Sequence, residues 1–153
     1  MDQDAFRRTY REINERTCVY EKSLLSRHCG CSQSKKICIA EREGIQCISD
    51  EAQTQCNELM ESLRKQARFA LKSNDDKGTL PHGKAMRLQV GGLRGLFLAL
   101  HPDTDKLPNC IDDVYGIINR AKETFGGLEK LPYQILIQQV AAYQDRVRGR
   151  GKE

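Results

Sequence analysis

The sequence predicts an all-α protein, a small bundle of about five helices with a cysteine-rich helix-loop-helix region in its N-terminal half. Apolar residues recur at steps of three and four in most of the long segments, which is the periodicity of amphipathic helices. No stretch shows the sustained alternation of apolar and polar residues typical of a half-buried strand. The 153 residues suffice for one compact core. We therefore expect a single helical domain over residues 1–147, followed by a flexible basic tail over residues 148–153.

The first expected helix runs from Asp4 to about Arg27. It should end in the sequence HCGCSQS, because Gly30 can adopt a left-handed conformation and serine favours turns and caps. Its apolar stripe repeats at alternating steps of four and three residues and comprises Phe6, Tyr10, Ile13, Thr17, Tyr20 and Leu24.

Two further helices complete the cysteine-rich half, residues 1–72. A helix of about two turns is expected over residues 35–43, closed by Gly44. Ser49 then offers an N-cap for a helix that should reach about Lys72, with acidic residues well placed in its first turn. The inward stripe of this helix comprises Ala52, Cys56, Leu59, Leu63, Ala67 and Ala70.

A loop over residues 73–83, SNDDKGTLPHG, separates the cysteine-rich half from a helical half over residues 84–147. The helix that follows the loop should end at Pro102. Glycines inside a helix cost about 1 kcal/mol each relative to alanine. We therefore expect a close helix crossing over Gly91 and Gly95 to compensate for that cost.

Two more helices are expected in the second half. One runs from about Ile111 to Phe125 and is capped by glycines 126 and 127. The other begins at Pro132, whose fixed φ suits the first position of a helix, and continues to Val147.

Composition and charge narrow the possible classes of protein. The net charge of +4 is modest and spread along the chain, so a nucleic-acid partner is not expected. No apolar run approaches the roughly 20 residues of a membrane span, and the N-terminal sequence shows no apolar signal region. We expect a cytoplasmic protein. A reducing compartment disfavours structural disulfides, so the seven cysteines favour metal or redox chemistry.

The segment from His28 to Cys56 holds five of the seven cysteines, and four of them stand nine residues apart. Nine residues turn a helix through about half a circle, so this spacing cannot place the thiols on one face of a continuous helix. Breaks at Gly30 and Gly44 would fold the segment and turn its thiols towards one point. The expected ligand set is Cys29, Cys31, Cys38 and Cys47, with Cys18 as a substitute.

An iron–sulfur cluster explains this set best, because a cluster accepts thiolates from several turns at irregular spacings. We favour a [4Fe–4S] cluster and expect four sulfurs to converge within about 7 Å. The hypothesis is a small cluster-binding protein without enzymatic activity, acting in electron transfer or as an accessory or sensor to a redox system, with a protein partner.

Other interpretations remain open. Zinc usually requires C-x₂₋₄-C knuckles, which are absent, although a Cys₃His site using His28 is conceivable. Cu(I) could bind the C-x-C pair as part of a metal-handling function. The chain could also be a helical interaction module with structural cysteines, paired in disulfides or buried as small apolar residues, and we expect burial for Cys56 and Cys110.

Overall fold

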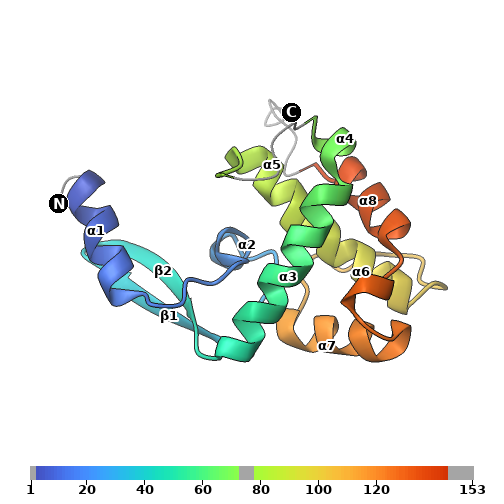
Figure 1. The fold of residues 1–153 in the computed structure, drawn as a ribbon, viewed down its shortest axis with the longest axis horizontal. Helices are drawn as coiled ribbons and strands as arrows, with labels where there is room; N and C mark the ends of the chain where they lie inside the picture. Colours follow the sequence, from blue (N-terminus) through green and yellow to red (C-terminus); the bar gives the residue numbers. More distant parts are fainter. Residues whose placement is uncertain (1–2, 73–77, 145–153) are drawn as a thin grey trace.

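The computed structural model describes residues 3–72 and 78–144. Helices make up most of this part, and one two-stranded antiparallel hairpin lies in the N-terminal half (Figure 1). The prediction of an all-α fold is therefore correct for most of the chain and wrong for this hairpin. Among the described residues, no helix is long and apolar enough to cross a membrane. The predicted tail over 148–153 lies outside the described residues.

The helical body contains the main core. It is built from α3 (Asp50–Gln66), α4 (Arg68–Leu71), α5 (His82–Met86), the π-helical turn η1 (Arg87–Gly91), α6 (Gly92–Leu100), α7 (Val114–Phe125), the 3₁₀ turn η2 (Leu128–Lys130) and α8 (Tyr133–Ala142). Figure 1 shows α3 running along the body, with α6 and α8 packed together beside it. Leucines and isoleucines from these helices, such as Leu63, Leu96, Ile118 and Leu136, are almost completely buried.

Helix α3 begins where the sequence predicts. The Ser49 side chain accepts a hydrogen bond from the backbone N–H of Ala52 at 3.1 Å, which satisfies one of the free donors at the helix start. The helix is interrupted at Ala67, and the short α4 ends at Lys72, whose φ of 54° is left-handed. Five residues of the predicted inward stripe are buried: Ala52, Cys56, Leu59, Leu63 and Ala67.

The predicted helix before Pro102 is confirmed, and it contains a wider turn. Elements α5, η1 and α6 follow one another without a break from His82 to Leu100. Within η1, the buried Gln89 side chain accepts hydrogen bonds from the Ser23 hydroxyl at 2.6 Å and from the Ser23 N–H at 3.3 Å. The first predicted loop residues, 73–77, lie outside the described residues.

Gly91 and Gly95 form the close crossing that the sequence predicts. A Cβ atom on Gly91 would lie 2.6 Å from the Cα of Val140, and one on Gly95 would lie 2.5 Å from the Cα of Leu136. The backbones of α8 and of the glycine-containing helix therefore touch at two successive turns. The contact explains why the helix retains residues that weaken it intrinsically.

Helices α7 and α8 differ from the prediction at their ends. Helix α7 begins at Val114 instead of Ile111, because the backbone of Ile111 pairs with the loop at residues 28–30. Gly126 ends it with a left-handed φ of 91°, as predicted. Pro132 immediately precedes α8. The helix ends at Ala142, because the backbone of Tyr143 is extended, with a ψ of 133°, so the predicted continuation to Val147 is wrong from Tyr143 onwards.

The long first helix of the prediction is wrong, because the chain breaks after Ile13. Helix α1 spans Gln3–Ile13 and the short α2 spans Glu21–Leu25. Between them the Asn14 amide donates to the carbonyl of Ile45 at 3.0 Å, and Thr17 pairs with Gln46 as an isolated β-bridge. Backbone pairing with the hairpin thus replaces the helical hydrogen bonds of this segment.

The hairpin occupies the segment predicted as a helix over residues 35–43. Strand β1 (Ser34–Ile39) pairs with β2 (Arg42–Cys47), with Ile39 opposite Arg42. The turn consists of Ala40 and Glu41, and Ala40 has a left-handed φ of 58°. The β-branched residues of KKICI favour a strand, and burial of Ile39 and Ile45 compensates for the strained turn.

The aromatic ring of Tyr10 packs helix α1 against the hairpin. A Cβ atom on Gly44 would lie 2.6 Å from the Tyr10 ring, so this glycine makes room for Tyr10 instead of closing a helix. The Tyr10 hydroxyl donates to the Glu21 carboxylate, which also accepts the N–H of Ile45 at 2.8 Å. These contacts join α1, α2 and β2.

The glycine crossing yields a prediction. Gly95→Ala should destabilise the fold by about 1–3 kcal/mol although alanine is the better helix former, because the new methyl group has no space. Gly83→Ala is the matched control, since nothing lies within 4 Å of its Cβ position, and it should stabilise the fold by up to about 1 kcal/mol. Urea unfolding of both variants measures the difference. Equal gains in stability would show that the crossing is not tightly packed.

Candidate metal centre

Four cysteines from four separate segments line one pocket: Cys18, Cys31, Cys47 and Cys56. Cys18 precedes α2, Cys31 lies in the loop before β1, Cys47 is the last residue of β2, and Cys56 lies on α3. The other lining residues are mainly apolar, among them Tyr20 and Val114. The pocket is therefore a water-poor space surrounded by thiols.

Backbone pairing brings Cys18 beside Cys47. The N–H of Cys18 donates to the carbonyl of Ile45 at 3.0 Å, and the N–H of Cys47 donates to the carbonyl of Arg16 at 2.7 Å. These bonds lay residues 16–18 along the outer edge of β2. Two cysteines separated by 28 intervening residues thus line the same pocket.

The loop that carries Cys31 is held by the segment before α7. The N–H of Gly30 donates to the carbonyl of Ile111 at 2.8 Å, and the N–H of Val114 donates to the carbonyl of Gly30 at 2.8 Å. The carboxylate of Asp113 accepts the N–H of Ser32 at 2.9 Å. A Cβ atom on Gly30 would lie 3.0 Å from the carbonyl oxygen of Asp112, so the glycine permits this close approach.

Burial shifts the acidity of these thiols. Burial, together with a smaller effect of the neighbouring cysteines, raises the pKa of Cys18 to about 11 and that of Cys56 to about 12. Burial also raises the pKa of Cys31. Free thiols at Cys18, Cys31 and Cys56 are therefore protonated at neutral pH, and a metal would have to displace their protons.

Backbone N–H groups point at two of the sulfurs and oppose the effect of burial. The N–H of Gln33 lies 3.5 Å from Cys31 Sγ, and together with the N–H of Tyr115 it lowers the pKa of Cys31. The N–H of Tyr20 acts in the same way on Cys18. Such donors stabilise a thiolate, and hydrogen bonds to sulfur also tune metal–thiolate centres.

The space between the thiols is small. The cavity has a volume of about 10 Å³, close to what one water molecule needs. Within residues 3–72 and 78–144, no group of three or more Cys, His, Asp or Glu side chains is arranged so that it could hold a metal ion. A metal centre at this pocket would therefore require the thiols to move from the positions that they occupy here.

Only some of the ligand candidates predicted from the sequence lie at the pocket. Cys31 and Cys47 line the pocket, as does Cys18, the expected substitute. Cys29 is buried beside this group, paired through its backbone with Ile111. Cys38 is exposed on β1, opposite Glu43.

His28 faces a different part of the molecule. Its Nδ1 lies 2.8 Å from the Ser26 hydroxyl, and its Nε2 lies 3.2 Å from the Tyr143 hydroxyl. The ring packs edge-on against Tyr143. Its ring nitrogens are thus directed at hydroxyl groups.

The two cysteines expected to be buried, Cys56 and Cys110, have different surroundings. Cys56 is buried, as expected for the apolar stripe of α3, yet the same position places it in the cysteine pocket. A helical stripe alone does not reveal whether a buried thiol faces apolar side chains or other thiols. Cys110 is exposed, so the expectation of burial for Cys110 is wrong.

Comparison with known proteins gives no relative for this chain: no protein-family model, no curated protein and no solved structure matches it. The pocket is therefore interpreted from its own chemistry.

Thiol reactivity provides a prediction for the metal-free, folded protein. At pH 8, iodoacetamide should modify the exposed Cys38 and Cys110 before Cys18. Only the thiolate form of a cysteine reacts with iodoacetamide. Because the pKa of Cys18 is about 11, its thiol is ionised in roughly one molecule in a thousand at this pH. Peptide mass spectrometry over time gives the order of labelling. Between pH 8 and 10 the rate at Cys18 should rise about tenfold per pH unit, since a raised pKa leaves the thiolate fraction still increasing. Labelling of Cys18 as fast as Cys38 at pH 8 would contradict the burial described above.

Proposed function

We propose that this chain is an iron–sulfur protein whose cluster is held by Cys18, Cys31, Cys47 and Cys56, and that it serves in electron transfer or as an accessory or sensor to a redox system. The observation that carries the proposal is that four cysteines from separate segments line one apolar pocket. Three of these residues were candidates on sequence grounds, and Cys18, the expected substitute, and Cys56 take the places of Cys29 and Cys38.

The surroundings of the sulfurs support a thiolate centre. Without a metal, the neighbouring cysteines raise the pKa of Cys18 and of Cys56, so these thiols gain no stabilisation of their ionised form from one another. The backbone N–H groups near Cys18 and Cys31 favour the ionised form that a metal requires. The apolar walls would exclude water from such a centre and so influence its reduction potential.

The spacing of the four cysteines favours a cluster. They are separated by 12, 15 and 8 residues, and none of the intervals forms the short knuckle of a structural zinc site. Ligands from several loops and a helix suit a group larger than one ion. A cluster at this place would also fasten the hairpin to α3 and to the loop that contacts α7.

Structural zinc is the second candidate, favoured by the cavity itself. A volume of about 10 Å³ matches a single small occupant. Four thiolates around one Zn²⁺ would give a closed tetrahedral site that stabilises the fold without redox chemistry.

Anaerobic purification distinguishes the two candidates. An iron–sulfur protein should be brown, with a broad absorption band at about 400 nm that arises from iron–thiolate bonding. It should also contain iron and acid-labile sulfide in similar amounts. A colourless protein with one zinc per chain would establish the second candidate. A protein that retains neither metal after anaerobic reconstitution would refute a metal centre.

Single cysteine variants test the ligand set. Each of the variants Cys18→Ser, Cys31→Ser, Cys47→Ser and Cys56→Ser should lose most of the bound metal, because each change deletes one of four thiolates. Cys38→Ser and Cys110→Ser are matched controls at exposed cysteines and should retain the metal content of the parent protein. Metal is measured by inductively coupled plasma mass spectrometry on folded protein. Loss of metal in Cys38→Ser, with retention in Cys56→Ser, would restore the sequence-based set and overturn this one.

A further inference from the structure

The two outer edges of the hairpin differ in their hydrogen bonding. On the edge of β2, the N–H of Cys18 donates to the carbonyl of Ile45 at 3.0 Å. The N–H of Cys47 donates to the carbonyl of Arg16 on the same edge at 2.7 Å. Strand β1 forms the opposite edge and, in the part of the chain that the structure describes, pairs with β2 alone. Figure 1 shows the hairpin projecting, with α1, to one side of the helical body, so the edge of β1 is open to another strand.

The register of the hairpin identifies the groups that this open edge presents. Backbone N–H and C=O groups point to alternate sides along a strand. Ile45 directs its groups to the outer edge of β2, so its neighbour Gly44 directs its own at β1, where it pairs with Ile37. By the same alternation, Lys36 and Cys38 direct their N–H and C=O groups away from β2. Both residues are exposed, and no described residue donates to or accepts from these four groups.

We propose that β1 pairs with β1 of a second copy of this chain, antiparallel and with Ile37 opposite Ile37. The open groups are arranged symmetrically about Ile37, because Lys36 precedes it and Cys38 follows it. In this register Lys36 of each copy stands opposite Cys38 of the other, and each such pair exchanges two hydrogen bonds. All four groups of each edge are then satisfied, in a two-fold contact of the kind that joins most homodimers.

Ile37 gives this interface an apolar centre. Its side chain is only partly buried in one copy. Its backbone groups face β2, so the two isoleucines form a non-hydrogen-bonded pair, the kind in which opposite side chains lie closest. The two side chains therefore cover each other from water.

The charges on β1 agree with this register. Lysine on an edge strand discourages pairing where like charges stand opposite each other. Here Lys36 faces Cys38 of the other copy. Lys35 faces Ile39 of the other copy, so no lysine stands directly opposite a lysine. Glu43 lies opposite Cys38 on β2, so the Lys36 ammonium of one copy approaches the Glu43 carboxylate of the other across a small side chain.

A like-charge approach on the other face of the sheet is weaker. Lys35 of one copy approaches Arg42 of the other, but Ile39 lies between them. The Arg42 guanidinium packs over the ring of Phe6 on α1, 4.4 Å from the ring centroid. The attraction between Lys36 and Glu43 therefore has no equal and opposite counterpart at this interface.

The contact closes at two copies. Residues 16–18 already occupy the outer edge of β2, so each copy offers one open edge of this sheet. Pairing through that edge gives a dimer, whereas two open edges would permit an endless row of strands.

Sedimentation equilibrium of the full chain measures the dimer. The parent chain should associate reversibly as its concentration rises towards about 100 µM, because an interface of this size is weak. Lys36→Pro should raise the dimer Kd at least about tenfold, because proline deletes an N–H that bonds only to the other copy. The hairpin should persist, since this N–H makes no bond to β2, and circular dichroism checks the fold. A parent chain that stays monomeric would overturn the proposal and leave the edge to a strand of another protein.

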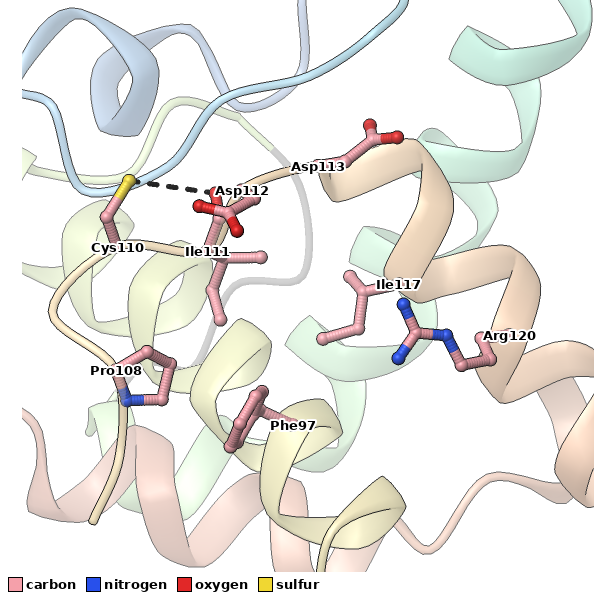
Figure 2. A pocket seen from close by; sticks show the side chains of 8 residues that line it. All are labelled: Phe97, Pro108, Cys110, Ile111, Asp112, Asp113, Ile117 and Arg120. Atoms are coloured by element: carbon pink, nitrogen blue, oxygen red, sulfur yellow. Dashed lines mark hydrogen bonds between the residues drawn. The ribbon is translucent and has the colours of Figure 1, made fainter.

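Cysteine cross-linking tests the register without the proline variant. The exposed Cys38 and Cys110 are first replaced by serine, so that neither reacts. Cys110 lies at a second hollow, of about 170 Å³, between α6, residues 108–113 and α7 (Figure 2). Ile37→Cys should then form a disulfide-linked dimer with oxidised glutathione, because the two opposite Cα atoms lie about 4.5 Å apart.

Lys35→Cys in the same background is the matched control on the same strand. Its counterpart in the other copy lies four residues further along, roughly 14 Å away, so it should cross-link much more slowly. Non-reducing electrophoresis over time compares the two variants. Equal rates of cross-linking, or a dimer that Lys36→Pro leaves at full strength, would show that the copies meet through another surface and would overturn the proposal.

Discussion

The pairing of residues 28–32 with residues 111–114 is the constraint on which the cysteine pocket depends. Its hydrogen bonds join a loop in the first quarter of the chain to the start of α7. Without them Cys31 would belong only to the hairpin, and Val114 would not contribute an apolar wall to the pocket. The same segment supplies Ile111 to the second hollow, so one stretch of backbone borders both cavities.

Most of the helices follow from local patterns in the sequence. The Ser49 cap, the helix before Pro102 and the left-handed Gly126 each depend on residues that are neighbours along the chain. Even the crossing of two helices was foreseeable, because Gly91 and Gly95 stand one helical turn apart and only a close neighbour compensates for them. The hairpin was missed for a physical reason. Its turn contains a strained Ala40 at a position where glycine would be expected. Its two strands contain only three β-branched residues, too few to show an alternation of apolar and polar residues.

The cysteine pocket shows the limit of reading ligands from spacing. Spacing identifies the members of a site when they share one element, whereas the cysteines that line this pocket come from four segments. Cys18 enters the pocket through strand-like pairing with β2, and Cys56 enters through the rotation of α3. Cys38 has the same regular spacing and is exposed on β1. Tertiary contacts between residues far apart in sequence decide which thiols meet, and no local pattern encodes them.

The π-helical turn at Arg87–Gly91 also fixes how insertions and deletions would act on this fold. A π turn holds one residue more than an α turn, so deleting one residue there would restore regular helix and shift the side chains within the turn, Arg87 and Gln89 among them, around the helix axis. Arg87 donates from its guanidinium to the carbonyls of Ala70, Val140 and Ala141, and Gln89 binds Ser23. Such a deletion would break one or both sets of bonds. The length of this helix, and not only its composition, is therefore under structural constraint.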